Sequence, residues 1–271
     1  MKKRIAGFVT LSAAVLLTGA CGEQGTAETV EITVVGSTTV QPLAECLGEA
    51  WEAIDPGVLI TVSGGGSSVG VNSASEQTAD IGMASREIKD SEIQNCPEIV
   101  VHTIARDGIA IVVHPDLAVD GITMEQARKI FAGEITDWSE AGGTPGTIFV
   151  VVREEGSGTR AAFEEIVMED DIIIDSAILQ PSNGAVRTSV ASTPGSIAFI
   201  SFGYLDSTTK PVAVNGALPT TENVNSGAYP IVRPLNMVTF GEPEGAVADW
   251  LEFIKGEDGQ AVVAAEGYLP L

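Results

Sequence analysis

The hydrophobic and polar positions of the chain alternate between two patterns. Short runs of apolar and β-branched residues predict buried strands over 30–35, 58–63, 79–85, 100–115, 147–153, 195–202 and 229–240. The segments between these runs predict helices over 42–54, 69–77, 123–133, 158–168 and 244–256. Strands that alternate with helices in this way are typical of parallel sheets covered by helices, so we expect an α/β fold.

Two details sharpen this prediction. In the helix over 42–54, a single face carries the apolar residues, and we expect that face to be buried: Leu43, Leu47, Ala50, Trp51 and Ile54. Gly133 is expected to end the helix over 123–133. The runs 100–115 and 229–240 are long and lie far apart in the sequence, so we interpret them as strands that cross between two lobes.

The composition narrows the class of protein. The 271 residues are enough for one large domain or for two lobes, and 44% of them are hydrophobic, as in a globular protein. With 14 basic and 37 acidic residues, the formal charge is −23. A nucleic-acid-binding surface requires a basic patch, so this charge argues against nucleic acid as a partner.

The first residues predict an export signal. A positively charged start is followed by an apolar segment over 5–17 that is too short to span a bilayer, and small residues precede Cys21. This pattern resembles a lipoprotein signal and implies a signal peptide over 1–20, lipidation of Cys21 and a polar tether over 21–29. Thr18 stands where such signals usually have Leu, so plain secretion and an uncleaved anchor remain alternatives.

Two further cysteines, Cys46 and Cys96, are candidates for a disulfide in an exported protein. Cys46 lies in a helical pattern, so two separate buried thiols are the alternative.

Four strand-to-helix junctions share one composition. Each strand run ends in small hydroxyl or glycine residues, at GSTT (36–39), GGGSS (64–68), ASR (84–86) and, after Arg153, GSGT (156–159). A helix N-terminus offers free N–H groups and a partial positive charge, while glycine lets a ligand approach the backbone. Several such termini, with Arg153 at the end of a strand, predict a site for an oxyanion.

Each junction also has simpler interpretations. Ser and Thr are ordinary helix caps, and a single such junction is typical of a cap. The segment 66–70 also fits the G-x-S-x-G pattern of serine hydrolases, with Ser68 as nucleophile and His102 or His114 as base. Both histidines fall in or at the end of an apolar strand, where a structural role is typical. His and Cys are not clustered, so the sequence indicates no metal site.

Taken together, the motifs resemble those of one family. They are GSTTV (36–40), SGGGSSVGV (63–71), DIGMASRE (80–87), ARDGIAIVVHP (105–115), IFAGEITDW (131–138), REEGSGTR (153–160) and YPIVRPL (229–235). In this order they resemble the phosphate-binding lipoproteins of phosphate ABC importers, which belong to the type II periplasmic-binding-protein family.

The resemblance implies a fold and a function. The fold has two α/β lobes joined by two crossing strands, here lobe 1 over 30–108 and 235–271 and lobe 2 over 109–234, with the ligand in the cleft between them. The function is capture of inorganic phosphate outside the membrane and delivery to the permease subunits of an ABC importer. A lipid-anchored monomer that is not an enzyme and needs no cofactor is expected. A binding protein for molybdate, tungstate or sulfate is the alternative.

Matching motifs imply the ligand residues. In lobe 1 these are Thr38 and Thr39 with Ser37 adjacent, and Ser67 with Ser68 adjacent. In lobe 2 they are Arg153, Ser157, Gly158 and Thr159.

One position departs from the family. Some members have an aspartate that accepts the proton of phosphate, where this chain has Ser85 followed by Arg86. A serine hydroxyl both accepts and donates, so it does not repel an anion that lacks a proton. We expect Arg86 to stand near the site and to neutralise part of the ligand charge. We also expect sulfate-like anions to be rejected less strongly than by a site with the aspartate.

Overall fold

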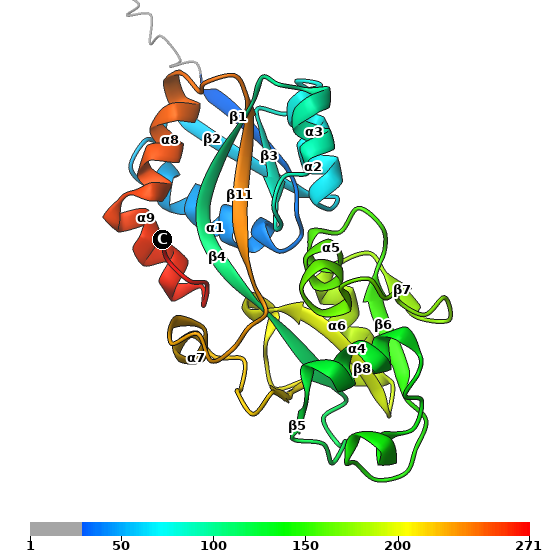
Figure 1. Cartoon of the computed structure of the whole chain (residues 1–271). Helices are drawn as coiled ribbons and strands as arrows, with labels where there is room; N and C mark the ends of the chain where they lie inside the picture. The colour runs from blue at the N-terminus through cyan, green and yellow to red at the C-terminus, as the bar shows by residue number, and fades with distance from the viewer. Residues whose placement is uncertain (1–28) are drawn as a thin grey trace, which may run out of the picture.

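A computed structural model describes residues 29–271 and shows two lobes linked by two long strands (Figure 1). The signal peptide, the lipidated Cys21 and most of the tether predicted from the sequence lie outside the described residues. One nine-stranded sheet runs through both lobes in the order β2-β1-β3-β11-β4-β8-β6-β7, with β9 paired to β4. The strands of this path are β1 (Val30–Gly36), β2 (Val58–Gly64), β3 (Ile81–Ala84), β4 (Ile99–Val113), β6 (Phe149–Arg153), β7 (Ile178–Gln180), β8 (Ser196–Ser201) and β11 (Val232–Phe240).

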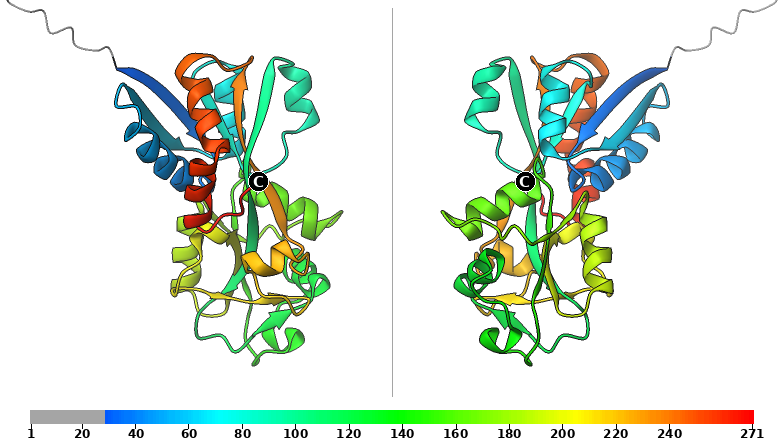
Figure 2. Two further views of the ribbon diagram at one scale, coloured as in Figure 1. Left: turned by 90° about the vertical axis from the view of Figure 1, so that its left-hand side faces the viewer. Right: turned by 90° about the vertical axis from the view of Figure 1, so that its right-hand side faces the viewer.

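The sheet is mixed in both lobes, because the strands beside β4 and β11 are antiparallel to them while the outer strands of each lobe are parallel. In the first lobe β1 pairs in parallel with β2 and β3, and in the second β6 pairs in parallel with β7 and β8. Between them, β11 is antiparallel to both β3 and β4, and β4 is antiparallel to β8. Because β4 and β11 continue from one lobe into the other, they are the crossing strands predicted from their length (Figure 2).

Helices cover both lobes. The remaining elements are α1 (Val40–Glu52), α2 (Ser67–Ser75), α3 (Asp90–Asn95), α4 (Met124–Ala132), α5 (Gly158–Phe163), α6 (Asn183–Ser192), α7 (Thr221–Asn225), α8 (Gly245–Lys255), α9 (Glu257–Ala265), a π-helical turn over Glu164–Met168, two 3-10 turns over Trp138–Ala141 and Phe202–Tyr204, and the short strands β5 (Gly121–Ile122), β9 (Lys210–Pro211) and β10 (Ala213–Val214). As predicted, α4 ends at Gly133, which adopts the left-handed conformation with φ 79°.

Each lobe has its own hydrophobic core. In the first lobe α1, α8 and α9 pack on the sheet around Leu43, Leu47 and Trp250. In the second lobe Phe131, Phe163 and Phe199 form an aromatic group between α4, α5 and β8. This segregation agrees with two lobes, while the boundaries at 108/109 and 234/235 stay a prediction.

The buried face of α1 differs in part from the prediction. Leu43 and Leu47 are fully buried, but the helix ends at Glu52 and the side chain of Ile54 is 59% exposed. Asp55 precedes Pro56, a position that disfavours the helical conformation, and the chain turns there. Trp51 is half-buried and packs against Phe253 of α8.

Among the described residues, Cys46 and Cys96 are separate free thiols, so the structure favours the alternative to a disulfide. Cys46 lies on α1 beside Glu266, and burial raises the pKa of its thiol. Cys96 follows α3 and packs against a small cluster that includes Val71 of α2. Because α1 and α2 cover opposite faces of the sheet, the two thiols belong to different layers (Figure 1).

Candidate functional site

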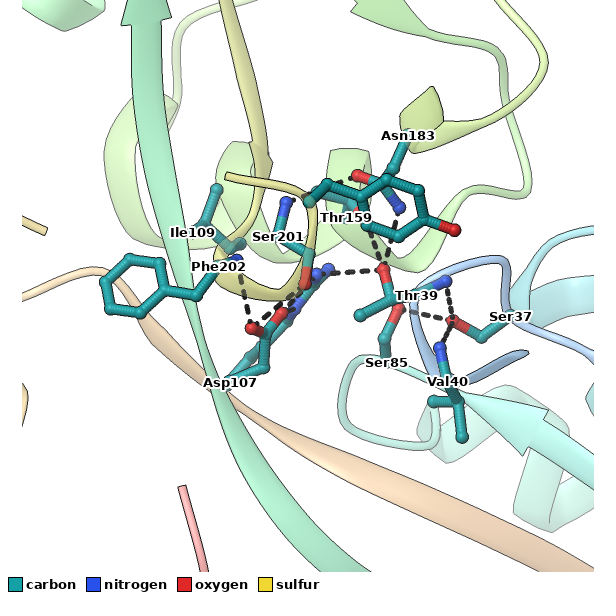
Figure 3. Close-up of polar contacts among 12 residues, drawn as sticks. Ser37, Thr39, Val40, Ser85, Asp107, Ile109, Thr159, Asn183, Ser201 and Phe202 are labelled. Atoms are coloured by element: carbon teal, nitrogen blue, oxygen red, sulfur yellow. Dashed lines mark hydrogen bonds and ion pairs between the residues drawn. The ribbon is translucent and has the colours of Figure 1, made fainter. Parts of the chain in front are cut away.

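The four hydroxyl-rich junctions meet where the lobes face each other. Three of them follow β1, β2 and β3 in the first lobe, and the fourth follows β6 in the second lobe. Three hydrogen bonds join the first-lobe junctions to the fourth. Arg153 Nη1 donates to Thr38 Oγ1 at 3.1 Å, the hydroxyls of Thr39 and Thr159 lie 3.1 Å apart, and the backbone N–H of Ser68 donates to the backbone oxygen of Gly156 at 3.1 Å. Predicted residues from distant parts of the chain are thus brought into one buried cluster (Figure 3).

Two of the predicted serines serve as helix caps. Ser37 Oγ accepts hydrogen bonds from the backbone N–H groups of Thr39 at 3.2 Å and Val40 at 3.4 Å, and donates to Ser85 Oγ at 2.9 Å. Ser157 Oγ accepts from the backbone N–H of Arg160 at 3.3 Å, as the cap of α5. For these two hydroxyls the simpler cap interpretation holds, and Ser37 acts on the site through Ser85.

Ser67 and Ser85 are the most deeply buried hydroxyl residues that the first lobe contributes to the cluster. Both are fully buried, and Ser67 Oγ accepts a hydrogen bond from the backbone N–H of Ser85 at 3.0 Å. Gly158 of the second lobe lies directly against them, because a Cβ at this position would collide with Ser67 Oγ and would lie 2.7 Å from Ser85 Oγ. Position 158 must therefore be glycine for the two lobes to approach each other this closely.

Arg153 provides the positive charge of the cluster. Its side chain is 1% exposed and also donates to the backbone oxygens of Gln180 at 3.3 Å and Pro181 at 3.0 Å. Glu154 folds back and pairs with Arg153 Nη2 at 2.8 Å, while Glu155 is exposed at the surface. One carboxylate therefore fixes the guanidinium, which leaves Nη1 facing Thr38.

The side chains of Arg86 and Ser68 bond each other, and Arg86 bonds Glu92, rather than the other described hydroxyls of the cluster, although the backbone N–H of Ser68 donates to the Gly156 oxygen of the second lobe. Arg86 donates to both carboxylate oxygens of Glu92, at 2.9 and 2.7 Å, and to Ser68 Oγ at 3.3 Å. Burial would raise the pKa of Glu92, but the hydrogen bonds from Arg86 hold that pKa below its ordinary value. Glu92 thus compensates the charge of Arg86. This pairing does not favour the expectation that Arg86 neutralises part of the ligand charge, which stays a prediction. Ser68 is only half-buried.

Three residues of the cluster were not among those predicted from the sequence. Asn183, the first residue of α6, donates from Nδ2 to Thr39 Oγ1 at 2.9 Å. Arg233 on β11 donates to Thr39 Oγ1 at 3.1 Å and to Asp107 on β4 at 2.7 Å. Asp107 lies in the motif 105–115 and Arg233 in the motif 229–235. Each is a charged residue inside an apolar strand run, and the two charges are opposite, which is the feature of the sequence that indicates a buried pair.

The Asp107–Arg233 pair is completely enclosed. The two residues are register partners on the crossing strands, and their side chains are 0% and 1% exposed. Burial raises the pKa of Asp107, while Arg233 and donors from Ser201 and Phe202 stabilise the carboxylate and oppose that rise. Each arginine of the cluster is thus paired with one carboxylate, so the groups that remain to bind a ligand are hydroxyls, amides and guanidinium N–H groups.

The serine hydrolase interpretation finds no support in the contacts of residues 29–271. Ser68 Oγ bonds Arg86, whereas His102 bonds Thr239 at 2.9 Å and His114 accepts from the backbone N–H of Asp116. Within this part of the chain, His, Cys, Asp and Glu do not gather into a group able to hold a metal ion. The described helices include none with the length and apolar character to cross a membrane.

A family model described as a PBP superfamily domain matches residues 22–258. The phosphate-binding protein PstS of Bacillus subtilis is 30% identical over 285 aligned positions, which cover 100% of this chain and 95% of the relative. The chain belongs to the PstS family within the PBP superfamily. PstS of Borreliella burgdorferi is also 30% identical, over 99% of both chains.

Solved structures agree with the PstS assignment. A phosphate ABC transporter substrate-binding protein from Clostridium perfringens, crystallised with bound phosphate, has a TM-score of 0.85 and 36% identity over 89% of this chain and 99% of its own. An ABC-type phosphate transport receptor from Vibrio cholerae has a TM-score of 0.74 and 32% identity over 89% of this chain and 100% of its own. The predicted two-lobe type II fold is therefore confirmed.

Proposed function

We propose that this chain binds inorganic phosphate in the cleft between its lobes and delivers it to the permease of an ABC importer. The names of its PstS relatives and of its structural neighbours support this proposal. The observation that carries it is the cluster itself, in which Arg153 of one lobe contacts Thr38 of the other among hydroxyls from four junctions. Such a cluster suits a small tetrahedral oxyanion, because donors converge on it from several directions.

The proposed ligand groups are those that the closed cleft brings together. They are Thr38, Thr39, Ser67, Ser85, Arg153, Gly158 and Thr159, with the N-terminal amides of α5 contributed by the segment that Ser157 caps. Ser37 has a supporting role, and Ser68 and Arg86 stand outside the proposed set. Closure of the two lobes around the anion is the working motion.

The negative net charge does not conflict with this proposal. Exposed charges more than about 10 Å away are screened at 0.1 M salt, so the buried guanidinium and the helix ends govern the cleft. The distant acidic surface is expected to slow the encounter with phosphate more than it weakens the bound state.

The same proposal covers the location of the protein. The predicted signal peptide over 1–20, lipidation of Cys21 and the tether over 21–29 would place the domain outside the cytoplasm and next to the permease. We propose that it works there as a monomer that carries phosphate without chemical change.

A thermal-shift screen against phosphate, arsenate, sulfate, molybdate and tungstate tests this function. A ligand at 100 times its Kd stabilises the folded state by about 2.7 kcal/mol, which is readily seen as a rise in Tm. We expect phosphate and arsenate to give the largest rise. A rise with molybdate or tungstate and none with phosphate would instead establish the alternative oxyanion.

A further inference from the structure

The hydroxyl of Thr39 receives two hydrogen bonds from groups that can only donate. Asn183 Nδ2 lies 2.9 Å from Thr39 Oγ1, and Arg233 Nη2 lies 3.1 Å from it. A hydroxyl has two acceptor positions and one proton, so these two donors occupy both acceptor positions. Only the proton of Thr39 is left, and it faces Thr159 Oγ1 across the cleft at 3.1 Å (Figure 3).

The orientation of both donors is fixed by groups behind them. Asn183 Oδ1 accepts a hydrogen bond from the backbone N–H of Ser201 at 3.3 Å, so its amide nitrogen faces Thr39, with a longer contact of 3.5 Å to Thr38 Oγ1. Arg233 donates to Asp107 Oδ2 from Nε at 3.1 Å and from Nη2 at 2.7 Å. The other oxygen of Asp107 accepts from Ser201 Oγ at 3.0 Å.

This arrangement is isolated from solvent. Asn183 is 0% exposed, Thr39 1% and Arg233 3%. In such surroundings a donor left without an acceptor is strongly unfavourable, so the two N–H groups hold the Thr39 oxygen firmly. In this closed arrangement the hydroxyl of Thr39 is shielded from bulk water, which could otherwise exchange the roles of donor and acceptor.

We propose that Asn183 and Arg233 are positioning residues that set ligand specificity by making Thr39 an obligatory hydrogen-bond donor. With phosphate bound, an oxygen of the ion takes the place of Thr159 Oγ1 as the acceptor of the Thr39 proton, and that oxygen must then be unprotonated. The inference rests on phosphate binding in the cleft and adds a preference between its two ionic forms. HPO₄²⁻, which has three unprotonated oxygens, is favoured over H₂PO₄⁻, which has two.

A double-mutant cycle measured by calorimetry with inorganic phosphate tests the route through Thr39. The variants are Asn183→Ala, Thr39→Val and the two combined. We expect Asn183→Ala to weaken phosphate binding roughly 3- to 10-fold when Thr39 is present, and less than about 2-fold in the Thr39→Val background. An equal loss in both backgrounds would overturn the proposal, because it would mean that Asn183 acts on phosphate independently of Thr39.

The pH dependence supplies a second readout that a purely structural role would not change. Phosphate affinity of the unmodified protein should rise between pH 6 and pH 8, as H₂PO₄⁻ becomes HPO₄²⁻. In Asn183→Ala one acceptor position of Thr39 becomes free to receive a P–OH proton, so this rise should be several-fold smaller. Arg233→Lys, which keeps the charge beside Asp107, should act in the same direction.

Sulfate carries no proton in this pH range and is the control ligand. The ratio of sulfate affinity at pH 8 to sulfate affinity at pH 6 should be the same in the unmodified protein and in Asn183→Ala. An unchanged phosphate ratio in folded Asn183→Ala and Arg233→Lys would overturn the inference. Failure of the unmodified protein to bind phosphate at either pH would instead overturn the proposed function.

Discussion

Replacement of Arg153 by methionine removes the charged donor of the cleft while it keeps a long side chain. The guanidinium is 1% exposed and holds one nitrogen against Thr38, where the ligand is proposed to bind. A hydrogen bond to a charged group is worth about 1.5–3 kcal/mol. Since 1.4 kcal/mol corresponds to a factor of ten, Arg153→Met should weaken phosphate binding roughly 10- to 150-fold.

A substitution of Glu154 separates the loss of the Arg153 donor from the repulsion that an unpaired Glu154 carboxylate would cause. Glu154 pairs with Arg153, and its second carboxylate oxygen is buried without a partner. Without the arginine, this carboxylate would repel any anion nearby and would exaggerate the loss. The double variant Arg153→Met, Glu154→Gln removes the repulsion, and we expect it to bind phosphate still about tenfold more weakly than the unmodified protein.

Isothermal titration calorimetry with phosphate measures both variants at one pH and one salt concentration. Arg128→Met is the matched control, since Arg128 forms ion pairs with Glu169 and Asp171 on the surface of the second lobe. Thermal unfolding without anion checks that each variant is folded. If the double variant bound phosphate within twofold of the unmodified protein, Arg153 would not be a ligand and the site would be misplaced.

Three further predictions concern closure, selectivity and stability. Gly158→Ala places a methyl group against Ser67 Oγ, so it should hold the lobes apart in small-angle scattering and weaken phosphate binding more than about tenfold, whereas Gly146→Ala, in open surroundings, should do neither. Ser85→Asp should weaken sulfate competition much more than phosphate binding, because sulfate brings no proton to share with the buried carboxylate; equal losses in competition titrations would argue against this. Burial, assisted by the charge of Lys255, lowers the pKa of His102, so the unfolded chain takes up a proton below about pH 6.5 that the folded chain does not. The free energy of unfolding should therefore fall from pH 7 to pH 5 in urea titrations, and His102→Gln should make this fall smaller. An equal fall in His102→Gln would mean that His102 is not its source.

The junctions were predictable because their chemistry is local. Each strand end is followed at once by its own small and hydroxyl residues, and Arg153 lies four positions before the cap of α5. Strands that carry their ligand groups at their carboxyl ends bring those groups to one edge of a parallel sheet. Thr38 follows a strand of the first lobe and Arg153 ends a strand of the second. If the ligand lies between two lobes, these two strand ends are expected to face each other.

The supporting contacts were not predictable because they depend on which elements become neighbours. Asp107 and Arg233 are 126 positions apart and meet only because β4 and β11 pair in one register. Arg86 forms an ion pair with Glu92 because Glu92 lies on α3, the short helix that follows it.

The choice between a disulfide and two separate thiols was open in the sequence for the same physical reason. Cys46 and Cys96 are both half-buried, but the face of the sheet on which each one packs is set by the topology. Neither the spacing of the cysteines nor their helical pattern carries that information.

A crystal structure of the protein grown with phosphate tests the central claim most directly. The account predicts one phosphate ion between the lobes, with oxygens within hydrogen-bond distance of Arg153, Thr38 and Thr39 and of the N-terminal amides of α5. It also predicts that Asn183 and Arg233 contact Thr39 and not the ion. Phosphate bound elsewhere, or an arginine at position 153 that makes no contact with it, would contradict the account.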